Sequence, residues 1–299
     1  IGACRSHAIV PVGYEDLNVV VETEQGKYFA KLFSASRSLD DCRRYITVVE
    51  KILEAGVSHP VLYQSSQGSL HQIKSNGSEI RLCLMQYING QTFYELGEKP
   101  TQEEGRFLIE QATKINAFHY KPPFVYDSWA ISNFLTEFDK KKHTLDAKDK
   151  ETLAPLVEQF KELSIDELSH SLVHGDIIST NVMRDDKGKL YILDCAVSSW
   201  YPRIQELAVL LCDLFFDTSS PEEFMSKYNW AVAEYQKHIQ LTPEELKVLP
   251  LFARVAHAMH VLGASSEKAK GNTQEENENW LELGRKGLEL SAQLQPEIS

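Results

Sequence analysis

Apolar and polar positions follow two different patterns along the chain. Up to about residue 87, short apolar runs alternate with turn residues, as is typical of β-strands. Strands are expected at 7–12, 18–24, 27–33, 61–64, 70–73 and 80–85. One helix interrupts them, from Leu39 to Ala55, and it ends at Gly56. From residue 88 onward helical spacing dominates, so we expect an α+β fold with a β-rich unit over 1–87 and a mainly helical one over 88–299.

Helix starts in the second part of the chain carry recognisable caps. Thr101, Ser220 and Thr242 each precede a glutamate by three positions, which is the spacing of a capping box. After Ser220 and Thr242 a proline occupies the first helical position. A last helix is expected over 275–294, and the apolar stripes of these helices are expected to form a core.

One stretch inside the helical part of the chain is predicted to form β-strands. Between Ser171 and Asp194 the pattern predicts a strand, a tight loop, and a hairpin of 181–184 and 189–193 turning at Asp-Asp-Lys-Gly. A hairpin of this length brings its ends together, so Asn181 and Asp194 are expected to meet, with Asp176 one loop away. Amide and carboxylate oxygens are ligands that Mg²⁺ prefers. A further carboxylate can orient or deprotonate a hydroxyl, which completes the groups that phosphoryl transfer needs.

The same stretch resembles a known family. HGDIISTN is similar to the H-G-D-x-x-x-x-N catalytic loop of the aminoglycoside phosphotransferase family, and LYILD to its metal-binding strand. That family is similar to protein kinases. The resemblance implies a two-lobed protein-kinase-like fold, ATP or GTP as co-substrate, and Mg²⁺ as cofactor. It implies that Asp176 is catalytic, that Asn181 and Asp194 hold the metal, and that His174 and Glu206 support the loop.

The resemblance extends to the nucleotide side. GYEDLNVVVETEQGKYFAKLF resembles the family's opening, which predicts that Lys31 pairs with nucleotide phosphates. A lysine in an apolar strand is costly to bury without an anionic partner, although Lys31 can instead point to solvent from a half-exposed strand. LCLMQYINGQTF resembles the segment that joins the lobes, where Gln86 and Ile88 bind the base through main-chain groups. The alternative for that segment is a core strand followed by a turn.

The chain departs from the family at three places. Kinases hold the strand lysine with a glutamate on the next helix, but the corresponding positions, 45–46, carry no acid. Glu50, one turn further on, is predicted to take that role; Asp41 is an alternative, and Glu50 can also be simply solvated. The expected Asp-Leu-Ala helix start is Glu206-Leu-Ala, so bracing of the catalytic loop is predicted through a longer side chain. Ser179-Thr180 stands where the family more usually has Pro-Gly or a similar pair.

Composition narrows the class of protein. The 299 residues are 42% hydrophobic and 25% charged, as in ordinary globular proteins. A net charge of −12 argues against a nucleic-acid partner and permits a cationic one. Five scattered cysteines without a CxxC spacing indicate a reducing compartment and no zinc site. No signal peptide is recognised and the longest apolar run is too short to span a bilayer, so we expect a cytoplasmic protein without a membrane partner.

The acceptor of the phosphate is the open question. Residues 121–151 combine Pro-Pro and the aromatics Phe124, Tyr126 and Trp129 with the lysine run 140–142, and specificity is expected there; the lysines can equally form a solvated helix face. The acceptor is expected to be a small-molecule hydroxyl, first of an aminoglycoside-type antibiotic. The alternatives are an amino alcohol or hydroxy amino acid, as in choline, homoserine and hydroxylysine kinases, and a catalytically weak nucleotide-binding pseudokinase.

Overall fold

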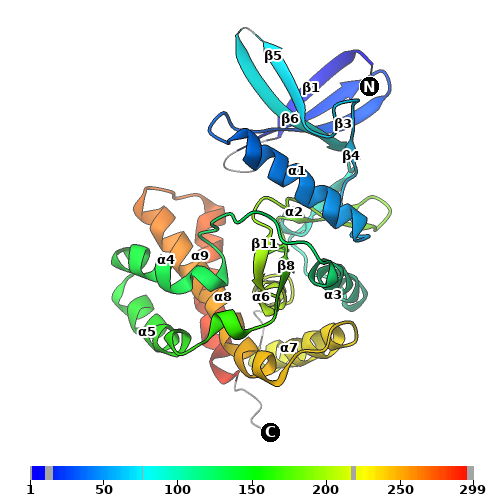
Figure 1. Cartoon of the computed structure of the whole chain (residues 1–299). Helices are drawn as coiled ribbons and strands as arrows, with labels where there is room; N and C mark the ends of the chain where they lie inside the picture. The colour runs from blue at the N-terminus through cyan, green and yellow to red at the C-terminus, as the bar shows by residue number, and fades with distance from the viewer. Residues whose placement is uncertain (1, 11–15, 76, 217–219, 295–299) are drawn as a thin grey trace. The chain divides into compact units, whose positions relative to one another are not determined.

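The computed structural model describes residues 2–10, 16–75, 77–216 and 220–294. Contacts divide the chain into two compact units (Figure 1), which we call the first unit (1–96 with 181–196) and the second unit (97–180 with 197–299). The first unit therefore extends past the boundary predicted at residue 87 and includes the hairpin after the H-G-D loop. Asn181 and Asp194 belong to the first unit, whereas Asp176 belongs to the second.

An antiparallel sheet forms most of the first unit. Its strands lie in the order β1-β2-β3-β6-β4, with β5 paired to β6: β1 (Cys4–Val10), β2 (Leu17–Thr23), β3 (Gly26–Leu32), β4 (Leu62–Tyr63), β5 (His71–Ser75) and β6 (Ser78–Gln86). Thr23 pairs with Gly26, so the β2–β3 turn is Glu24-Gln25, one position earlier than predicted. Residues 11 and 12, the end of the first predicted strand, lie outside the described residues.

Helix α1 (Leu39–Glu54) lies beside this sheet (Figure 1). Ser38 and Asp41 form a capping box at its start. Its buried face is largely apolar, and it includes Cys42, Tyr45, Ile46, Val48, Val49 and Ile52. Burial of this face holds the helix on the strands, because apolar surface leaves water there.

A second, smaller sheet in the first unit carries the hairpin. It contains β7 (Gly90–Thr92), β9 (Val182–Asp185) and β10 (Leu190–Ile192) in the order β10-β9-β7, and α2 (Phe93–Leu96) follows β7. Gly90 is required by this pairing, because a Cβ atom there would lie 2.4 Å from the carbonyl oxygen of Arg184. The close approach gives a physical reason for glycine at the end of the segment that follows β6.

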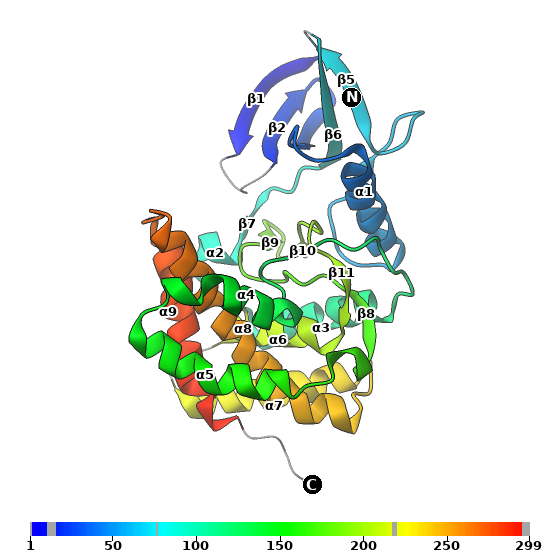
Figure 2. The same ribbon diagram turned by 60° about the vertical axis from the view of Figure 1, so that its left-hand side comes forward.

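In its described residues the second unit is helical apart from one pair of strands (Figure 2). The strands are β8 (His170–Val173) and β11 (Ser199–Pro202), and the helices are α3 (Gln102–Ala117), α4 (Phe134–Lys141), α5 (Ala147–Lys161), α6 (Ile204–Cys212), α7 (Pro221–Gln236), α8 (Pro243–Ala269) and α9 (Glu275–Leu290). Thr101 and Thr242 form the predicted capping boxes, and the Ser220 side chain accepts from Glu223 N. The mixed α+β architecture, with an N-terminal antiparallel sheet and a helical C-terminal region, confirms the predicted fold class.

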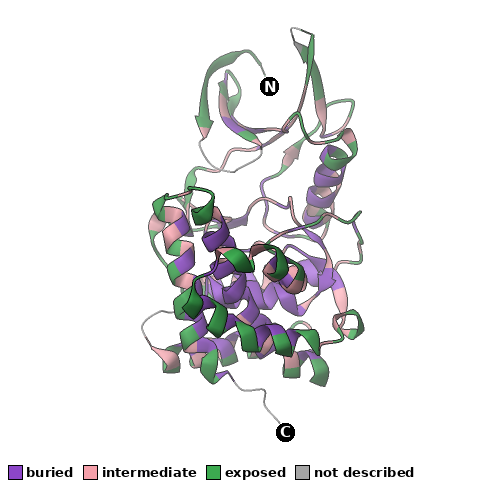
Figure 3. Cartoon of the chain, turned by 90° about the vertical axis from the view of Figure 1, so that its left-hand side faces the viewer, coloured by how far each residue is buried: buried purple, intermediate pink, exposed green. Residues whose placement is uncertain are grey.

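Helix α8 is buried along most of its length in the second unit, and Figure 3 shows the chain coloured by burial. Within the described residues it is the one helix that is long and apolar enough to cross a membrane. Inside the fold, 83% of its most apolar 18-residue stretch is buried. Such burial is what a core helix of a soluble protein shows. The predicted last helix ends at Leu290 instead of residue 294, and a short 3₁₀ turn (Ser291–Gln293) follows it.

Candidate active site

The hairpin of β9 and β10 places two predicted metal ligands at one end. Val182 pairs with Ile192, and Leu193 N donates to the main-chain oxygen of Asn181 over 2.8 Å. Asp194 is the next residue after Leu193, so it begins at the same end of the hairpin as Asn181. The pairing of apolar strand residues therefore brings the two polar residues together, as the pattern predicted.

Asp194 has a strained backbone that hydrogen bonds hold in place. Its φ of 55° is the only positive value at a non-glycine residue in the described part of the chain. Its Oδ1 accepts from Ala196 N over 3.2 Å, and Arg44 on α1 donates to the main-chain oxygen of Ala196 over 3.2 Å. The carboxylate is 41% exposed, so it remains accessible to a ligand.

Lys31 is buried on β3 and paired with acids. Only 5% of the residue is exposed, which rules out the alternative that it points to solvent. Its Nζ donates to Asp194 Oδ2 over 2.9 Å and lies 3.7 Å from Asp16 Oδ2. Burial lowers the pKa of Lys31, but the attraction and hydrogen bond of Asp194, with a smaller contribution from Asp16, outweigh it and raise the pKa above its usual value.

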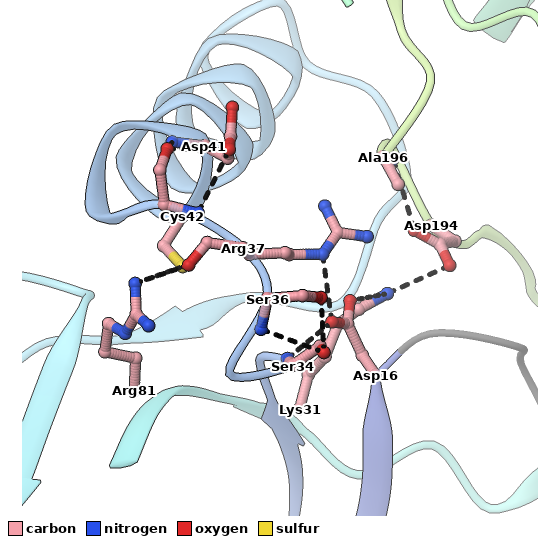
Figure 4. Close-up of polar contacts among 11 residues, drawn as sticks. Asp16, Lys31, Ser34, Ser36, Arg37, Asp41, Cys42, Arg81, Asp194 and Ala196 are labelled. Atoms are coloured by element: carbon pink, nitrogen blue, oxygen red, sulfur yellow. Dashed lines mark hydrogen bonds and ion pairs between the residues drawn. The ribbon is translucent and has the colours of Figure 1, made fainter. Parts of the chain in front are cut away.

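Asp16 is a site residue that the sequence analysis missed. Figure 4 shows its carboxylate between Lys31, Ser34 and Arg37. Its Oδ1 accepts from Arg37 Nε and from Ser34 N, each over 3.0 Å, and the side chain is 4% exposed. No local sequence pattern marks Asp16, and its place becomes clear only from the strand register, in which Asn18, two residues later, pairs directly with Lys31 across β2 and β3.

Glu50 does not hold Lys31, contrary to the prediction. Its carboxylate accepts from Ser69 Oγ over 2.7 Å, and Asp41, the alternative, is used in the cap of α1. The helix position where an acid was missing carries Tyr45, whose ring centroid lies 4.9 Å from Lys31 Nζ. An ammonium over an aromatic face is attracted by the electrons of the ring. Lys31 is therefore held by an aromatic face and by Asp16, neither of which requires an acid on α1.

The segment predicted to bind the base follows the main sheet. Gln86 is the last residue of β6, and its N–H donates to the main-chain oxygen of Val61 over 2.9 Å. That N–H is therefore already used within the sheet, and a base contact by Gln86 through its main-chain oxygen stays a prediction. Ile88 is half-buried between β6 and β7, and its role stays a prediction.

The catalytic loop of the second unit begins directly after β8. Gly175 has a φ of +81°, which explains glycine at that place in the H-G-D sequence. His174 Nδ1 accepts from Asp176 N over 3.3 Å, so the histidine supports the loop. Glu206 accepts from His174 N over 2.5 Å and from Gly175 N over 3.2 Å, despite its additional methylene. Asp176 is thus carried on a backbone with defined hydrogen bonds.

Glu206 lies in an apolar environment at the start of α6. It has no solvent exposure, and burial raises its pKa to about 7, although the hydrogen bonds from His174 and Gly175 act in the opposite direction. Its neighbour Gln205 accepts from both Ser132 N and Ser132 Oγ. Because both Ser132 donors bind the amide oxygen of Gln205, its amide nitrogen is left on the other side, toward Gly175. That nitrogen would lie 3.8 Å from a Cβ atom built on Gly175.

The residues of the hairpin end fit a magnesium ion by their chemistry. An amide oxygen and a carboxylate are hard ligands, and Mg²⁺ in kinases is usually held by one or two such groups with phosphate oxygens and water completing the octahedron. In the residues that the structure describes, no group of three or more His, Cys, Asp or Glu side chains could hold a metal ion. Asn181 and Asp194 are residues that could hold such an ion together with phosphate oxygens and water.

The segment expected to carry specificity contains exposed rings. Phe124, Tyr126 and Trp129 are 68%, 43% and 44% exposed. The lysine run is a set of ion pairs on α4 and just after it, since Lys140 and Lys141 bind Glu137 and Lys142 binds Asp139. A cavity of ≈ 520 Å³ lies between α4 and α5, and none of the predicted site residues lines it.

Comparisons with known proteins agree with this geometry. The model of the phosphotransferase enzyme family matches residues 7–238. A homoserine kinase of Rhizobium meliloti is 20% identical over 254 residues, which cover 85% of this chain and 77% of the relative. Two solved kinases have similar folds. The amicoumacin kinase hAmiN, in complex with AMP-PNP and Ca²⁺, has a TM-score of 0.65 and 16% sequence identity, and the match covers 97% of this chain and 90% of the other. A microcompartment-associated aminopropanol kinase has a TM-score of 0.69 and 12% sequence identity, and the match covers 96% of this chain and 91% of the other.

The family match spans most of both units, from β1 to the end of α7. It covers Lys31, the H-G-D loop, the hairpin with Asn181 and Asp194, and Glu206. The chain therefore belongs to the phosphotransferase enzyme family and is a small-molecule phosphotransferase.

Proposed function

We propose that the protein transfers the γ-phosphate of ATP or GTP to a hydroxyl group of an amine-bearing small molecule, an amino alcohol or a hydroxy amino acid. The observation that carries the proposal is the buried ion pair of Lys31 with Asp194 at the hairpin end where Asn181 lies. A buried ammonium of raised pKa stays charged at neutral pH, so it is suited to neutralise phosphate oxygens.

The roles of the side chains follow from their chemistry. Lys31 binds phosphate oxygens, and Asn181 and Asp194 hold Mg²⁺, which would neutralise charge on the phosphates when bound. Asp176 accepts the hydrogen bond of the acceptor hydroxyl, orients its oxygen toward the phosphorus, and receives its proton as the bond to phosphorus forms. A carboxylate of ordinary pKa is a weak base for an alcohol, so orientation is its main contribution.

The choice of acceptor rests on the curated relative. The match at the level of sequence is to a homoserine kinase, whose acceptor is a hydroxy amino acid, and one structural neighbour is an aminopropanol kinase. Both names describe small molecules with an amine and a hydroxyl. The net charge of −12 permits an acceptor that carries an ammonium group.

A second candidate is an aminoglycoside-type antibiotic, which the resemblance of the catalytic loop favours. The amicoumacin kinase supports it, since that fold neighbour was solved with its own small-molecule ligand. The exposed rings of Phe124, Tyr126 and Trp129 offer a surface for a larger acceptor. This candidate would make the gene a resistance determinant.

A panel assay distinguishes these candidates. Purified protein is incubated with ATP or GTP, Mg²⁺ and each of a set of amino alcohols, hydroxy amino acids and aminoglycosides, and phosphorylated products are detected by ³¹P NMR. We expect one amino alcohol or hydroxy amino acid to be phosphorylated, and at least a hundredfold loss with Asp176→Asn, since a positioned acid–base group contributes about 10²–10⁴-fold. Phosphorylation of aminoglycosides alone would identify the second candidate.

Nucleotide binding without transfer to any acceptor would indicate the pseudokinase alternative instead. Calorimetric titration with AMP-PNP tests it directly, because binding does not require an acceptor. Growth tests on antibiotic plates with the expressed gene complete the comparison.

The cysteines bear on the location of the protein. Four of the five are buried and none forms a disulfide, which supports a reducing, cytoplasmic location.

A further inference from the structure

The catalytic loop is held at a second point by Asp213. Ser179 N donates to Asp213 Oδ2 over 2.5 Å, and the aspartate is 2% exposed. Asp213 follows Cys212, the last residue of α6, while Ser179 lies near the end of the loop that begins at His174. Glu206, at the other end of α6, binds the beginning of the same loop. Asp176 therefore lies between two points at which carboxylates of one helix and its cap bind the loop backbone.

The position of Asp213 is unfavourable for a carboxylate. The carbonyl groups at the end of a helix carry partial negative charge, so an acid there is repelled, and burial adds a desolvation penalty. Two donors offset this: Ser179 N and the ammonium of Lys99, which donates to the main-chain oxygen of Asp213 over 2.6 Å and lies 3.5 Å from Oδ1. A buried acid in such a place is expected to persist only where its hydrogen bond matters.

The residue at position 179 explains why this bond exists here. The family that the loop resembles more usually carries proline at this place, and proline has no N–H to donate. Proline would restrict the loop through its fixed φ, whereas serine leaves the backbone freer but supplies a donor. The side chain of Asp213 is the acceptor that this donor finds.

We propose that Asp213 is a positioning residue for phosphoryl transfer: through Ser179 N–H it fixes the end of the catalytic loop, and with Glu206 it sets the position of Asp176. This inference rests on the proposed function, because positioning matters only if Asp176 orients an acceptor. Asp213 touches neither acceptor nor nucleotide in this scheme, so its loss changes the rate of transfer more than the binding of either.

A double-mutant cycle tests the inference. The variants are Asp213→Asn, Ser179→Pro and their combination, with Ser179→Ala as the variant that keeps the N–H. We expect Asp213→Asn to lower kcat about tenfold with KM values changed less than threefold, because the amide oxygen can still accept from Ser179 N but lacks the negative charge that strengthens the bond. In the Ser179→Ala background, which keeps the N–H, Asp213→Asn should lower kcat by the same factor as in the parent protein. In the Ser179→Pro background the further substitution of Asp213 should change kcat less than twofold, because the bond is already absent.

Asp149→Asn is the matched control. Asp149 is also a buried carboxylate of the second unit with a cationic partner, Arg285, at 2.7 Å, but it has no contact with the catalytic loop. The Asp149→Asn protein should have a lower free energy of unfolding than the parent protein and an unchanged kcat. An equal loss of kcat from Asp213→Asn in the parent and in the Ser179→Pro background would overturn the inference, as would a change in stability alone, like that of the control.

Hydrogen exchange keeps the test independent of the acceptor. We expect Asp213→Asn to speed the exchange of the backbone amides of residues 174–180 at least tenfold, and Asp149→Asn to leave them unchanged. If no acceptor is ever phosphorylated, the proposed function fails while the exchange data still decide whether Asp213 holds the loop. Unchanged exchange at residues 174–180 in a folded Asp213→Asn protein would reject the role of Asp213. If that variant does not fold, the contrast between Ser179→Pro and Ser179→Ala gives the same decision.

Discussion

Lys31 shows how a single charged residue is accommodated in an apolar strand. Its ammonium has two carboxylate partners and one aromatic face, contributed by Asp194, Asp16 and Tyr45. Asp194 is also a proposed metal ligand, while Asp16 and Tyr45 are assigned to the ammonium. This division of roles can be tested one residue at a time.

The ring of Tyr45 is predicted to be needed for nucleotide binding, and its hydroxyl is not. Tyr45→Phe keeps the ring, whereas Tyr45→Leu removes the attraction between ring and ammonium, which is worth about 0.5–2 kcal/mol. We expect Kd for AMP-PNP with Mg²⁺ to rise three- to tenfold for Tyr45→Leu and less than twofold for Tyr45→Phe, by calorimetry. Glu50→Gln is the control, since Glu50 contacts Ser69 instead of Lys31. Equal losses from the leucine and phenylalanine variants would contradict the assignment.

Glu206 is predicted to make stability depend on pH in an unusual direction. Its folded pKa of about 7 lies above the ordinary value of 4.5, so its stabilising contribution is complete below pH 4.5 and is lost as pH rises through 7. The difference in free energy of unfolding between the parent protein and Glu206→Gln should therefore fall by about 3 kcal/mol from pH 4.5 to pH 8. Denaturant unfolding at both pH values measures it, and all other titrating groups cancel in the difference. A constant difference would exclude the raised pKa.

At the scale of elements, short pairings decide where the chemistry lies. The hairpin of β9 and β10 brings Asn181 to Asp194, and β7 completes its sheet with residues that are distant in sequence. Helix α6 offers a carboxylate at its start and another just past its end to the catalytic loop. In both cases the length of a regular element sets the distance between polar groups.

Gly90→Ala is predicted to break the pairing of β7 with β9. The added Cβ would lie 2.4 Å from the carbonyl oxygen of Arg184, and backbone atoms on both sides leave no side chain to move aside. We expect a loss of about 1–3 kcal/mol in the free energy of unfolding, as for other overpacked sites. Faster hydrogen exchange at Arg184 and Asp185 would locate the effect. Thr92→Ser in the same strand serves as the control, and a loss equal to that of Gly90→Ala would argue against the steric explanation.

Sequence patterns are sufficient to predict the elements whose signals are local. Helix α1 and the capped starts at Thr101 and Thr242 agree with their local signals, because caps and apolar periodicity act over a few residues. The Glu50 prediction failed because an acid on the correct helix can lie on the wrong side of it. Asp16 and Asp213 were missed because each acts on a partner that is distant in sequence, and no local pattern marks such a pair.

At the scale of the whole molecule, buried imidazoles make the fold sensitive to acid. Burial lowers the pKa of His59 and of His260 to about 4 and that of His257 well below its usual value. The rings of His257 and His260 pack among aromatic side chains; the ring centroids of His257 and Phe216 are 4.8 Å apart, and those of His260 and Trp280 are 5.0 Å apart. A histidine buried in the neutral form contributes stability that is present above pH 6.5 and lost as the pH falls, opposite in sign to Glu206.

Acid unfolding of the second unit is predicted to depend on His257. In His257→Phe the ring is kept and the titration is removed, so the variant should lose about 2 kcal/mol less stability than the parent protein between pH 6.5 and pH 5. Chemical denaturation at the two pH values gives the comparison. His238→Gln, at an exposed position of the same unit, is the control and should follow the parent protein. A His257→Phe curve parallel to that of the parent would show that His257 already titrates normally.

The sequence by itself determined the fold class, the H-G-D loop, the hairpin with its two oxygen ligands and the strand lysine, because these depend on short-range periodicity and on residues a few positions apart. Only the tertiary structure decided what holds Lys31 and the catalytic loop. Tyr45, Asp16 and Asp213 reach their partners through packing of separate elements. Such contacts depend on which face of a helix or strand is buried against which neighbour, and that choice is made by the fold as a whole.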